Sequence, residues 1–244
     1  MSAVAIIPAR GGSKRLPRKN IIDFLGRPII GYTIEAGIRS GCFERVVVST
    51  EDDEIAAVSG ACGATVDRRA PALASDSAGV VDVCIDLLDR EAAAGRRWEV
   101  MACLYATAPM RIASDIRATV SLLEGGVCDF AMAVTSFDLS PYHAMRLAPD
   151  SRLSPVFPEL IESQERDLPR LRVDNGSTYA VNVAEFQRHK TFYGPNLRGH
   201  DMPRMRSSDI DTPEDYELAL WTARSINFPA DQSHGAGDGK ISRP

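Results

Sequence analysis

The sequence predicts an α/β protein with a doubly wound, mostly parallel sheet that carries helices on both faces. Short apolar runs rich in β-branched residues, AVAII, RVVVST, EVMACLYA and DFAMAVT, alternate with longer segments of helical periodicity. Such strand–helix–strand repeats join parallel neighbours. A parallel sheet is covered on both faces, so its strands read as continuous apolar runs, as they do here.

The helical segments are marked by apolar spacing and by their ends. In 28–41, Ile30, Ile34 and Ile38 recur at helical spacing, while Pro28 suits the first turn and Gly41 suits the end. Two further helices are expected, over 78–94 and over about 213–225.

Domain organisation follows from where this alternation breaks. Residues 1–226 predict a single α/β domain, because 244 residues with 44% hydrophobic content fit one large core. Residues 137–172 are rich in proline and charge and too long for a simple connection, so we expect an insertion with its own role. The glycine-rich, polar segment 227–244 is expected to be a disordered tail.

Composition excludes several classes of partner. The formal charge is −5, from 28 basic and 33 acidic residues, so no overall basic field favours nucleic acid or an anionic membrane. No apolar run reaches the length needed to span a bilayer. The five cysteines are odd in number and lack zinc spacing, and most lie in apolar runs. We expect buried, reduced thiols in a cytoplasmic protein.

The loop PARGGSKRLPRKN, residues 8–20, directly follows the first predicted strand. Ligands of parallel sheets bind at the carboxyl ends of the strands, and paired glycines let backbone N–H groups approach an anion. Five cations accompany the glycines: Arg10, Lys14, Arg15, Arg18 and Lys19. The spacing is neither GxxxxGK[ST] nor GxGxxG. We interpret the loop as a triphosphate site rather than as a solvated basic loop.

The segment Asp209–Ile210–Asp211 is a candidate metal site. In an extended segment, two carboxylates separated by one residue point the same way, and hard oxygen ligands suit Mg²⁺. Asp211–Thr212–Pro213 also fits an ordinary helix start. Both roles are expected together, with Asp215 on a solvated face of that helix.

Several motifs occur together in one order: PARGGSKRLPRKN, GRPIIGYTIEA, RAPALASD, CLYATAPM, SPYHAMRL, VDNGSTYAV and DIDTPEDYELA. In this order they resemble the acylneuraminate cytidylyltransferases, or CMP-sialic acid synthetases, and their pseudaminic and legionaminic acid relatives. The resemblance covers roughly residues 3–223 and implies the Rossmann-like fold of nucleotide-diphospho-sugar transferases. It further implies magnesium-assisted, in-line transfer of CMP from CTP to a nonulosonic acid. It also implies a homodimer with composite sites, in which the insertion 137–172 reaches toward the partner's active site.

The resemblance also implies roles for individual residues. The nucleotide-binding set is Ala9, Arg10, Gly11, Gly12, Ser13, Lys14, Lys19, Asn20, Arg69 and Ala78, with Val80 standing where Ser or Thr is commoner. Catalytic roles fall to Arg10, Lys19 and Asp211, and the metal to Asp209 and Asp211. The sugar-binding set is Tyr105, Arg166, Asn175 and Tyr179. From the sequence alone, Asn175 also fits an Asn–Gly turn and Tyr179 a core tyrosine.

The identity of the sugar is left open by the motifs. CLYATAP and SPYHAMRL look like the pseudaminic branch, whereas VDNG is similar to sialic and legionaminic enzymes. Arg166 is shifted from the family's carboxylate-binding position, so Arg146, Arg170 and Arg172 are further candidates for that role. Two alternative functions are a 3-deoxy-manno-octulosonate cytidylyltransferase and a non-catalytic CTP sensor.

Overall fold

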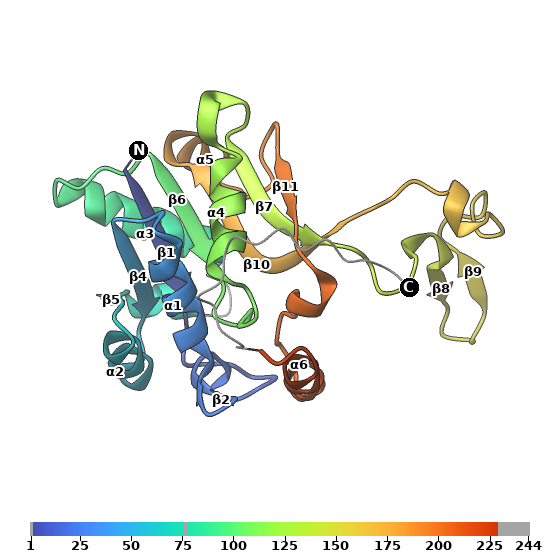
Figure 1. The fold of residues 1–244 in the computed structure, drawn as a ribbon, viewed down its shortest axis with the longest axis horizontal. Coiled ribbons are helices and arrows are strands. Elements are labelled where there is room, and N and C mark those ends of the chain that lie inside the picture. Colours follow the sequence, from blue (N-terminus) through green and yellow to red (C-terminus); the bar gives the residue numbers. More distant parts are fainter. Residues whose placement is uncertain (1, 76–77, 229–244) are drawn as a thin grey trace.

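The computed structural model describes residues 2–75 and 78–228. Its centre is a seven-stranded sheet in the order β11-β7-β10-β6-β1-β4-β5 (Figure 1). The strands are β1 (Ala3–Pro8), β4 (Arg45–Thr50), β5 (Thr65–Arg68), β6 (Val100–Leu104), β7 (Phe130–Thr135), β10 (Val173–Asn182) and β11 (Arg198–Asp201). Pairing is parallel except at β10, which runs antiparallel to both β6 and β7. The predicted mostly parallel α/β sheet is confirmed.

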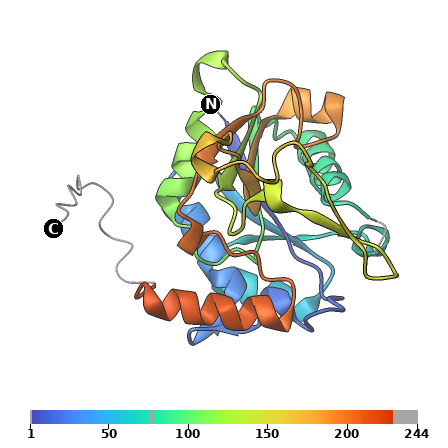
Figure 2. The same ribbon diagram turned by 90° about the vertical axis from the view of Figure 1, so that its right-hand side faces the viewer.

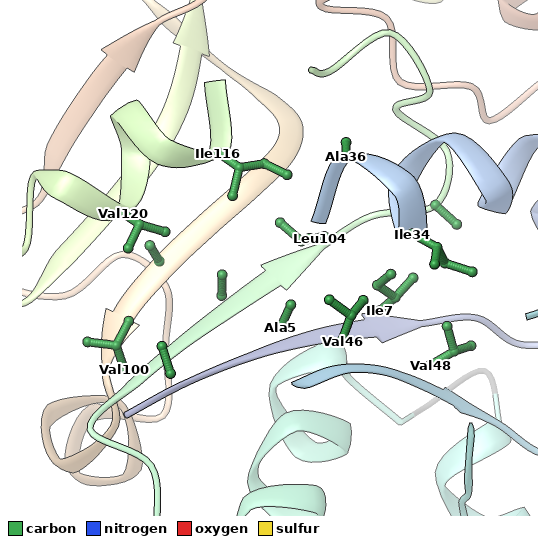
Figure 3. Close-up of a cluster of buried hydrophobic side chains, with 14 of the residues drawn as sticks. Ala5, Ile7, Ile34, Ala36, Val46, Val48, Val100, Leu104, Ile116 and Val120 are labelled. Atoms are coloured by element: carbon green, nitrogen blue, oxygen red, sulfur yellow. The ribbon is translucent and has the colours of Figure 1, made fainter. Parts of the chain in front are cut away.

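Helices cover both faces of the sheet. On one face lie α1 (Ile29–Ser40), α2 (Asp53–Ala61) and α4 (Ala113–Ser121), which pack on alternate residues of β1 and β4. Figure 3 shows Ile34 of α1 and Ile116 of α4 directed toward these strands. The opposite face carries α3 (Val80–Ala93) and α5 (Val183–His189).

The helix predicted over 28–41 is α1, and its ends follow the expected chemistry. Pro28 precedes it, and Gly41 ends it at φ +66°, donating its N–H to Ile38 O. Its apolar side differs in one respect, because the Ile38 side chain is 48% exposed.

The helix α6 (Pro213–Ser225) lies across the end of the sheet where β1 terminates (Figures 1 and 2). It packs there on the small hairpin of β2 (Asp23–Phe24) and β3 (Arg27–Pro28) and on the start of α1. Phe228 continues this packing, with its ring centroid 5.8 Å from that of Tyr32. Residues 227 and 228 of the predicted tail are thus part of the described structure, and residues 229–244 lie outside it.

Residues 137–172 leave the sheet and form a separate lobe containing β8 (Met145–Leu147) and β9 (Leu153–Pro155), which pair antiparallel. Figure 1 shows this lobe well away from the sheet. The predicted role in dimerisation stays a prediction.

All five cysteines are free, but only three of them are buried, since Cys42 and Cys62 are partly exposed. Across the described residues, no helix is both long and apolar enough to cross a membrane.

Candidate active site

The carboxyl ends of β1, β5 and β6 open into a cavity of about 260 Å³. It gathers half of the predicted nucleotide-binding set: Arg10, Lys19, Asn20, Arg69 and Ala78. Val80, the first residue of α3, also lines this cavity and supplies no hydroxyl. The remaining predicted residues, Ala9, Gly11, Gly12, Ser13 and Lys14, belong to the same loop but do not line this cavity.

The loop after β1 is held in place by its own side chains and by acidic residues that follow β4. Asn20 is buried and donates its Nδ2 to Arg10 O (2.8 Å). The N–H of Gly11 donates to Glu51 Oε1 (2.8 Å). A Cβ at Gly11 would lie 2.4 Å from Asp52 Oδ2, so the close approach of Asp52 requires glycine there. The Gly11 amide, expected to face phosphate, is thus engaged by a carboxylate.

Glu51 links this loop to the other end of the cavity. Its Oε2 accepts from Nε of Arg69 (3.1 Å) and lies 3.0 Å from Nη2. The Arg69 side chain is only 4% exposed, and its Nη2 makes no hydrogen bond of good geometry among the described residues. This buried N–H group can therefore donate to an acceptor bound in the cavity.

Asp209 and Asp211 are set in place by the strand-like segment between β11 and α6. Ile210 is fully buried and donates its N–H to Thr107 O (2.9 Å). Oδ1 of Asp209 accepts from Thr107 Oγ1 (2.6 Å), and burial raises the pKa of Asp209. Burial acts the same way on Asp211, but its ion pairs with Lys19 and Arg15 hold its pKa below the usual value.

This donor set fits a hard divalent cation. Asp209 carries a carboxylate that burial destabilises as an anion, and Asp211 already attracts two side-chain cations. Added positive charge here would stabilise both ionised carboxylates, and carboxylate oxygens are the ligands that Mg²⁺ prefers.

The sequence predicted that Asp215 lies on a solvated face of the helix. Its side chain instead caps the start of α6. Its Oδ2 accepts from the N–H of Thr212 (2.8 Å), while Thr212 Oγ1 accepts from the N–H of Asp215 (3.2 Å). This is a capping box with Pro213 in the first turn, so the helix-start interpretation of Asp211–Thr212–Pro213 is confirmed.

A second cavity of about 740 Å³ adjoins the first, because Tyr105 lines both. Three of the predicted sugar-binding residues line it: Tyr105, Asn175 and Tyr179. The ring centroids of Tyr105 and Tyr179 are 5.4 Å apart, and Tyr179 donates its O–H to Asp174 Oδ2 (2.8 Å). Asp209 lines the same cavity, so the candidate metal site lies at its edge.

Asn175 uses its amide within the protein. Its Oδ1 accepts from the N–H of Ser177 (3.1 Å), and its Nδ2 donates to Ser207 Oγ (3.1 Å). Gly176 follows at φ +66°, and β10 changes register between Asp174 and Tyr179. The predicted Asn–Gly turn is present, as an irregularity within one strand rather than as the turn of a hairpin.

Arg166 is not brought to either cavity. It lies in the separate lobe with its side chain 77% exposed, 3.8 Å from Asp167. Within this chain it does not join Tyr105, Asn175 and Tyr179, because the insertion extends away from the sheet, and its contact with the sugar stays a prediction. Arg146, Arg170 and Arg172 do not line the 740 Å³ cavity either.

Three residues that the sequence did not single out take part in the site. Glu51 joins Gly11 to Arg69, Arg204 lines the larger cavity, and Arg111 is completely buried next to Tyr105, the residue that lines both cavities. Arg111 donates to the carbonyl oxygens of Ser177 and Tyr105, and burial lowers its pKa to about 10. Of these three residues, only Glu51 could have been predicted from the sequence. It directly follows the apolar run of β4, at the edge of the sheet where ligands bind.

The family model described as Cytidylyltransferase matches residues 4–139. A pseudaminic acid cytidylyltransferase of Campylobacter jejuni is 33% identical over 223 residues, which cover 90% of this chain and 95% of that protein. The CMP-N,N'-diacetyllegionaminic acid synthase of Legionella pneumophila is 34% identical over 223 residues, covering 89% and 94%. An N-acylneuraminate cytidylyltransferase of Escherichia coli is 30% identical over 227 residues, covering 92% of this chain and 52% of that protein.

Solved structures agree with the fold. CMP:2-keto-3-deoxy-manno-octonic acid synthetase complexed with CTP has a TM-score of 0.69 at 16% identity, covering 93% of this chain and all of that one. The 4-diphosphocytidyl-2C-methyl-D-erythritol synthase of Anaerococcus prevotii has a TM-score of 0.62 at 13% identity, covering 91% and 98%. The family match and the relatives of 30–34% identity confirm the resemblance read from the motifs: this chain belongs to the cytidylyltransferases and is a nucleotidyltransferase of their acylneuraminate, pseudaminic and legionaminic branch.

Proposed function

We propose that this enzyme joins CMP from CTP to the anomeric hydroxyl of a nonulosonic acid of the pseudaminic or legionaminic type, releasing pyrophosphate. The observation that carries the proposal is the pair of adjoining cavities that share Tyr105, with Asp209 and Thr107 at their junction. One cavity has two loop cations, Arg10 and Lys19, for a triphosphate, and the other, of about 740 Å³, has room for a nine-carbon sugar. The names of the C. jejuni and L. pneumophila relatives support this substrate class.

In this proposal Arg10 and Lys19 bind the triphosphate, and Arg69 donates to the base through the N–H that lacks a good partner within the described residues. Lys19 then faces the charge that develops on the leaving pyrophosphate. Its present partner, Asp211, is free to exchange that ammonium for Mg²⁺. With Mg²⁺ held by Asp209 and Asp211, the metal would polarise the α-phosphate and orient the attacking hydroxyl.

We further propose that the enzyme is a homodimer formed through residues 137–172 and acts in the cytoplasm. The antiparallel pair β8–β9 supports the dimer, because Leu147 and Leu153 lie opposite each other in it and are 71% and 63% exposed. Five free cysteines fit a reducing compartment.

The test is pyrophosphate release from CTP and Mg²⁺ with a panel of pseudaminic, legionaminic, sialic and 3-deoxy-manno-octulosonic acids. UTP, ATP and GTP serve as controls for base selection. Release with CTP and a pseudaminic or legionaminic acid is expected. Release only with the octulosonic acid would replace the proposed substrate, and CTP binding without release from any acid would indicate a sensor.

A further inference from the structure

Arg111 is the largest fully buried side chain in the described part of the chain, and no step of the proposed transfer uses it. Among the described residues, its hydrogen bonds go to two backbone carbonyl groups, those of Tyr105 and Ser177, and its Nε makes none. Burying a cation among neutral partners is costly, and an apolar side chain of similar volume would avoid that cost. An apolar side chain could not, however, hold carbonyl groups of two different strands together.

The two carbonyl groups lie where β6 and β10 separate. Thr178 is the first residue of β10 that pairs with β6, opposite Leu104. Just outside this pair, Ser177 O accepts from the N–H of Tyr105 (3.2 Å) and from Nη1 of Arg111. Both Nη atoms of Arg111 also donate to Tyr105 O (3.4 Å). The guanidinium therefore links the two strand ends through charge-assisted hydrogen bonds, beside the residue that lines both cavities.

Both strand ends lead directly to Asp209. On the side of β6, Thr107 donates its hydroxyl to Asp209 Oδ1 (2.6 Å), and its carbonyl oxygen accepts from the N–H of Ile210 (2.9 Å). On the side of β10, a Cβ at Gly176 would lie 2.5 Å from Asp209 Oδ2, so the backbone there packs against the carboxylate. Thr107 follows Tyr105 by two residues, and Gly176 directly precedes Ser177. Each carboxylate oxygen is thus approached by one of the two strand ends that the guanidinium links.

We propose that Arg111 is a positioning residue, which fixes the ends of β6 and β10 relative to each other and thereby orients the Asp209 carboxylate toward the metal. The inference rests on the metal site of the proposed function. Groups that hold a metal ligand in place affect metal affinity although they do not touch the metal.

Asp115 supplies the countercharge and restrains the backbone that precedes Asp209. It is buried, its Oδ2 accepts from the N–H of Ile112 (3.0 Å), and its attraction for Arg111 opposes the lowering of the arginine pKa by burial. It also forms an ion pair with Arg206, whose Nη2 donates to Oδ1 (3.0 Å). Arg206 stands three residues before Asp209, so this segment too is tied to the buried charges.

The experiment measures the binding of Mn²⁺, as a substitute for Mg²⁺, to the enzyme with CTP present and no sugar acid, by the relaxation of water protons. Arg111→Met retains an apolar chain in the buried space but cannot hold the two carbonyl oxygens. The dissociation constant for Mn²⁺ should therefore rise roughly 10- to 100-fold. Arg111→Lys retains the charge and can donate to one of the carbonyl groups, so its effect should be intermediate.

Thr107→Val tests the route by which Arg111 acts. It removes the hydroxyl that holds Asp209 Oδ1 and should weaken Mn²⁺ binding in the same direction. Combined with Arg111→Lys, it should have less than the sum of the two separate effects, because both substitutions act on one carboxylate. Additive effects would overturn this route. If Arg111→Met does not fold, Arg111→Lys and the combined variant provide the comparison.

Val120→Ala is the control for a loss of stability alone. Val120 is a buried residue of α4 that lines neither cavity, so its truncation should lower the melting temperature and leave the affinity for Mn²⁺ unchanged. Unchanged Mn²⁺ affinity in both Arg111 variants, or an equal loss in Val120→Ala, would overturn the proposal. So would Mn²⁺ binding that Asp209→Asn does not weaken. If Mn²⁺ binding behaves as expected but no nonulosonic acid yields pyrophosphate, the proposed function fails and the positioning role of Arg111 stands.

Discussion

Asp209 and Asp211 are two residues apart, yet their carboxylates lie in different surroundings. The Asp209 carboxylate accepts a hydrogen bond from the Thr107 hydroxyl, while the Asp211 carboxylate pairs with Lys19 and Arg15. Removing the charge of Asp211 therefore leaves the fold little changed but alters the balance of charge around Lys19.

The first prediction is that Asp211→Asn lowers the rate of pyrophosphate release roughly 100-fold or more, because a metal ligand and the partner of Lys19 are lost together. The melting temperature should change little. The measurement is initial rate against Mg²⁺ concentration, with Glu214→Gln, an exposed carboxylate at the start of α6, as the control. Near-normal release at low Mg²⁺ would show that Asp211 is not a metal ligand.

For single residues, the sequence predicted those site residues that are contiguous in the chain. It missed the site residues whose contact partners are distant in the chain. The loop cations and Asp209–Asp211 form recognisable short motifs, and three of these residues, Arg10, Lys19 and Asp209, line the cavities. Glu51 and Arg204 acquire their positions from contacts with Arg69 and Asp138, 18 and 66 residues away in the chain. The sequence could not place Arg166 relative to the cavities, because no local pattern reveals the direction in which an insertion leaves the sheet.

Among the structural elements, β10 contributes most to the shape of the larger cavity. Its irregular segment contains Gly176, at φ +66°, where a Cβ would lie 2.5 Å from Asp209 Oδ2. A side chain there would meet two costs: the strained backbone conformation and the displacement of Asp209.

The second prediction is that Gly176→Ala loses most of its activity and about 1–3 kcal/mol of stability. Gly126→Ala is the matched control, because Gly126 has φ +68° but no atom within 4 Å of its Cβ position. It should lose only the backbone share, about 1 kcal/mol, and keep its activity. Thermal unfolding and kcat measure both effects, and equal behaviour of the two variants would contradict the steric role of Asp209.

Helices were easier to predict than the sheet. The apolar spacing and ends of 28–41 predicted α1 to within one residue at each end. The antiparallel direction of β10 was not foreseen, because STYAVNV has the same apolar character as the parallel strands. Strand direction depends on the route of the preceding chain, here the lobe 137–172, and a local pattern contains no record of that route.

For the whole molecule, one partly exposed ion cluster predicts how stability depends on pH. Hydrogen bonds from Arg96 and Arg45 lower the pKa of Glu91, on α3, from 4.5 to about 2. The native state thus favours the ionised form, so this stabilisation is present above pH 4.5 and is lost as the pH falls toward 2.

The third prediction follows: Glu91→Gln lowers the free energy of unfolding by about 1–2 kcal/mol at pH 7, allowing for the partly exposed arginines. The difference from the unsubstituted protein should shrink steadily below pH 4.5, where the native Glu91 begins to lose its advantage. Urea denaturation at several pH values measures it, with Glu44→Gln as an exposed control. A difference that is independent of pH would show that packing, rather than charge, is responsible.

The last prediction concerns assembly, which the lobe 137–172 is proposed to mediate. Leu147→Asp places a charge on the exposed face of β8, opposite Leu153. If that face is buried in a homodimer, the charge must be desolvated on association, so the dissociation constant should rise at least roughly 10-fold. Val127→Asp, at a site 56% exposed beside α4, is the control and should leave the dimer intact. Sedimentation at micromolar concentration distinguishes the two, and a Leu147→Asp protein that sediments as the unsubstituted one would remove this face from the interface.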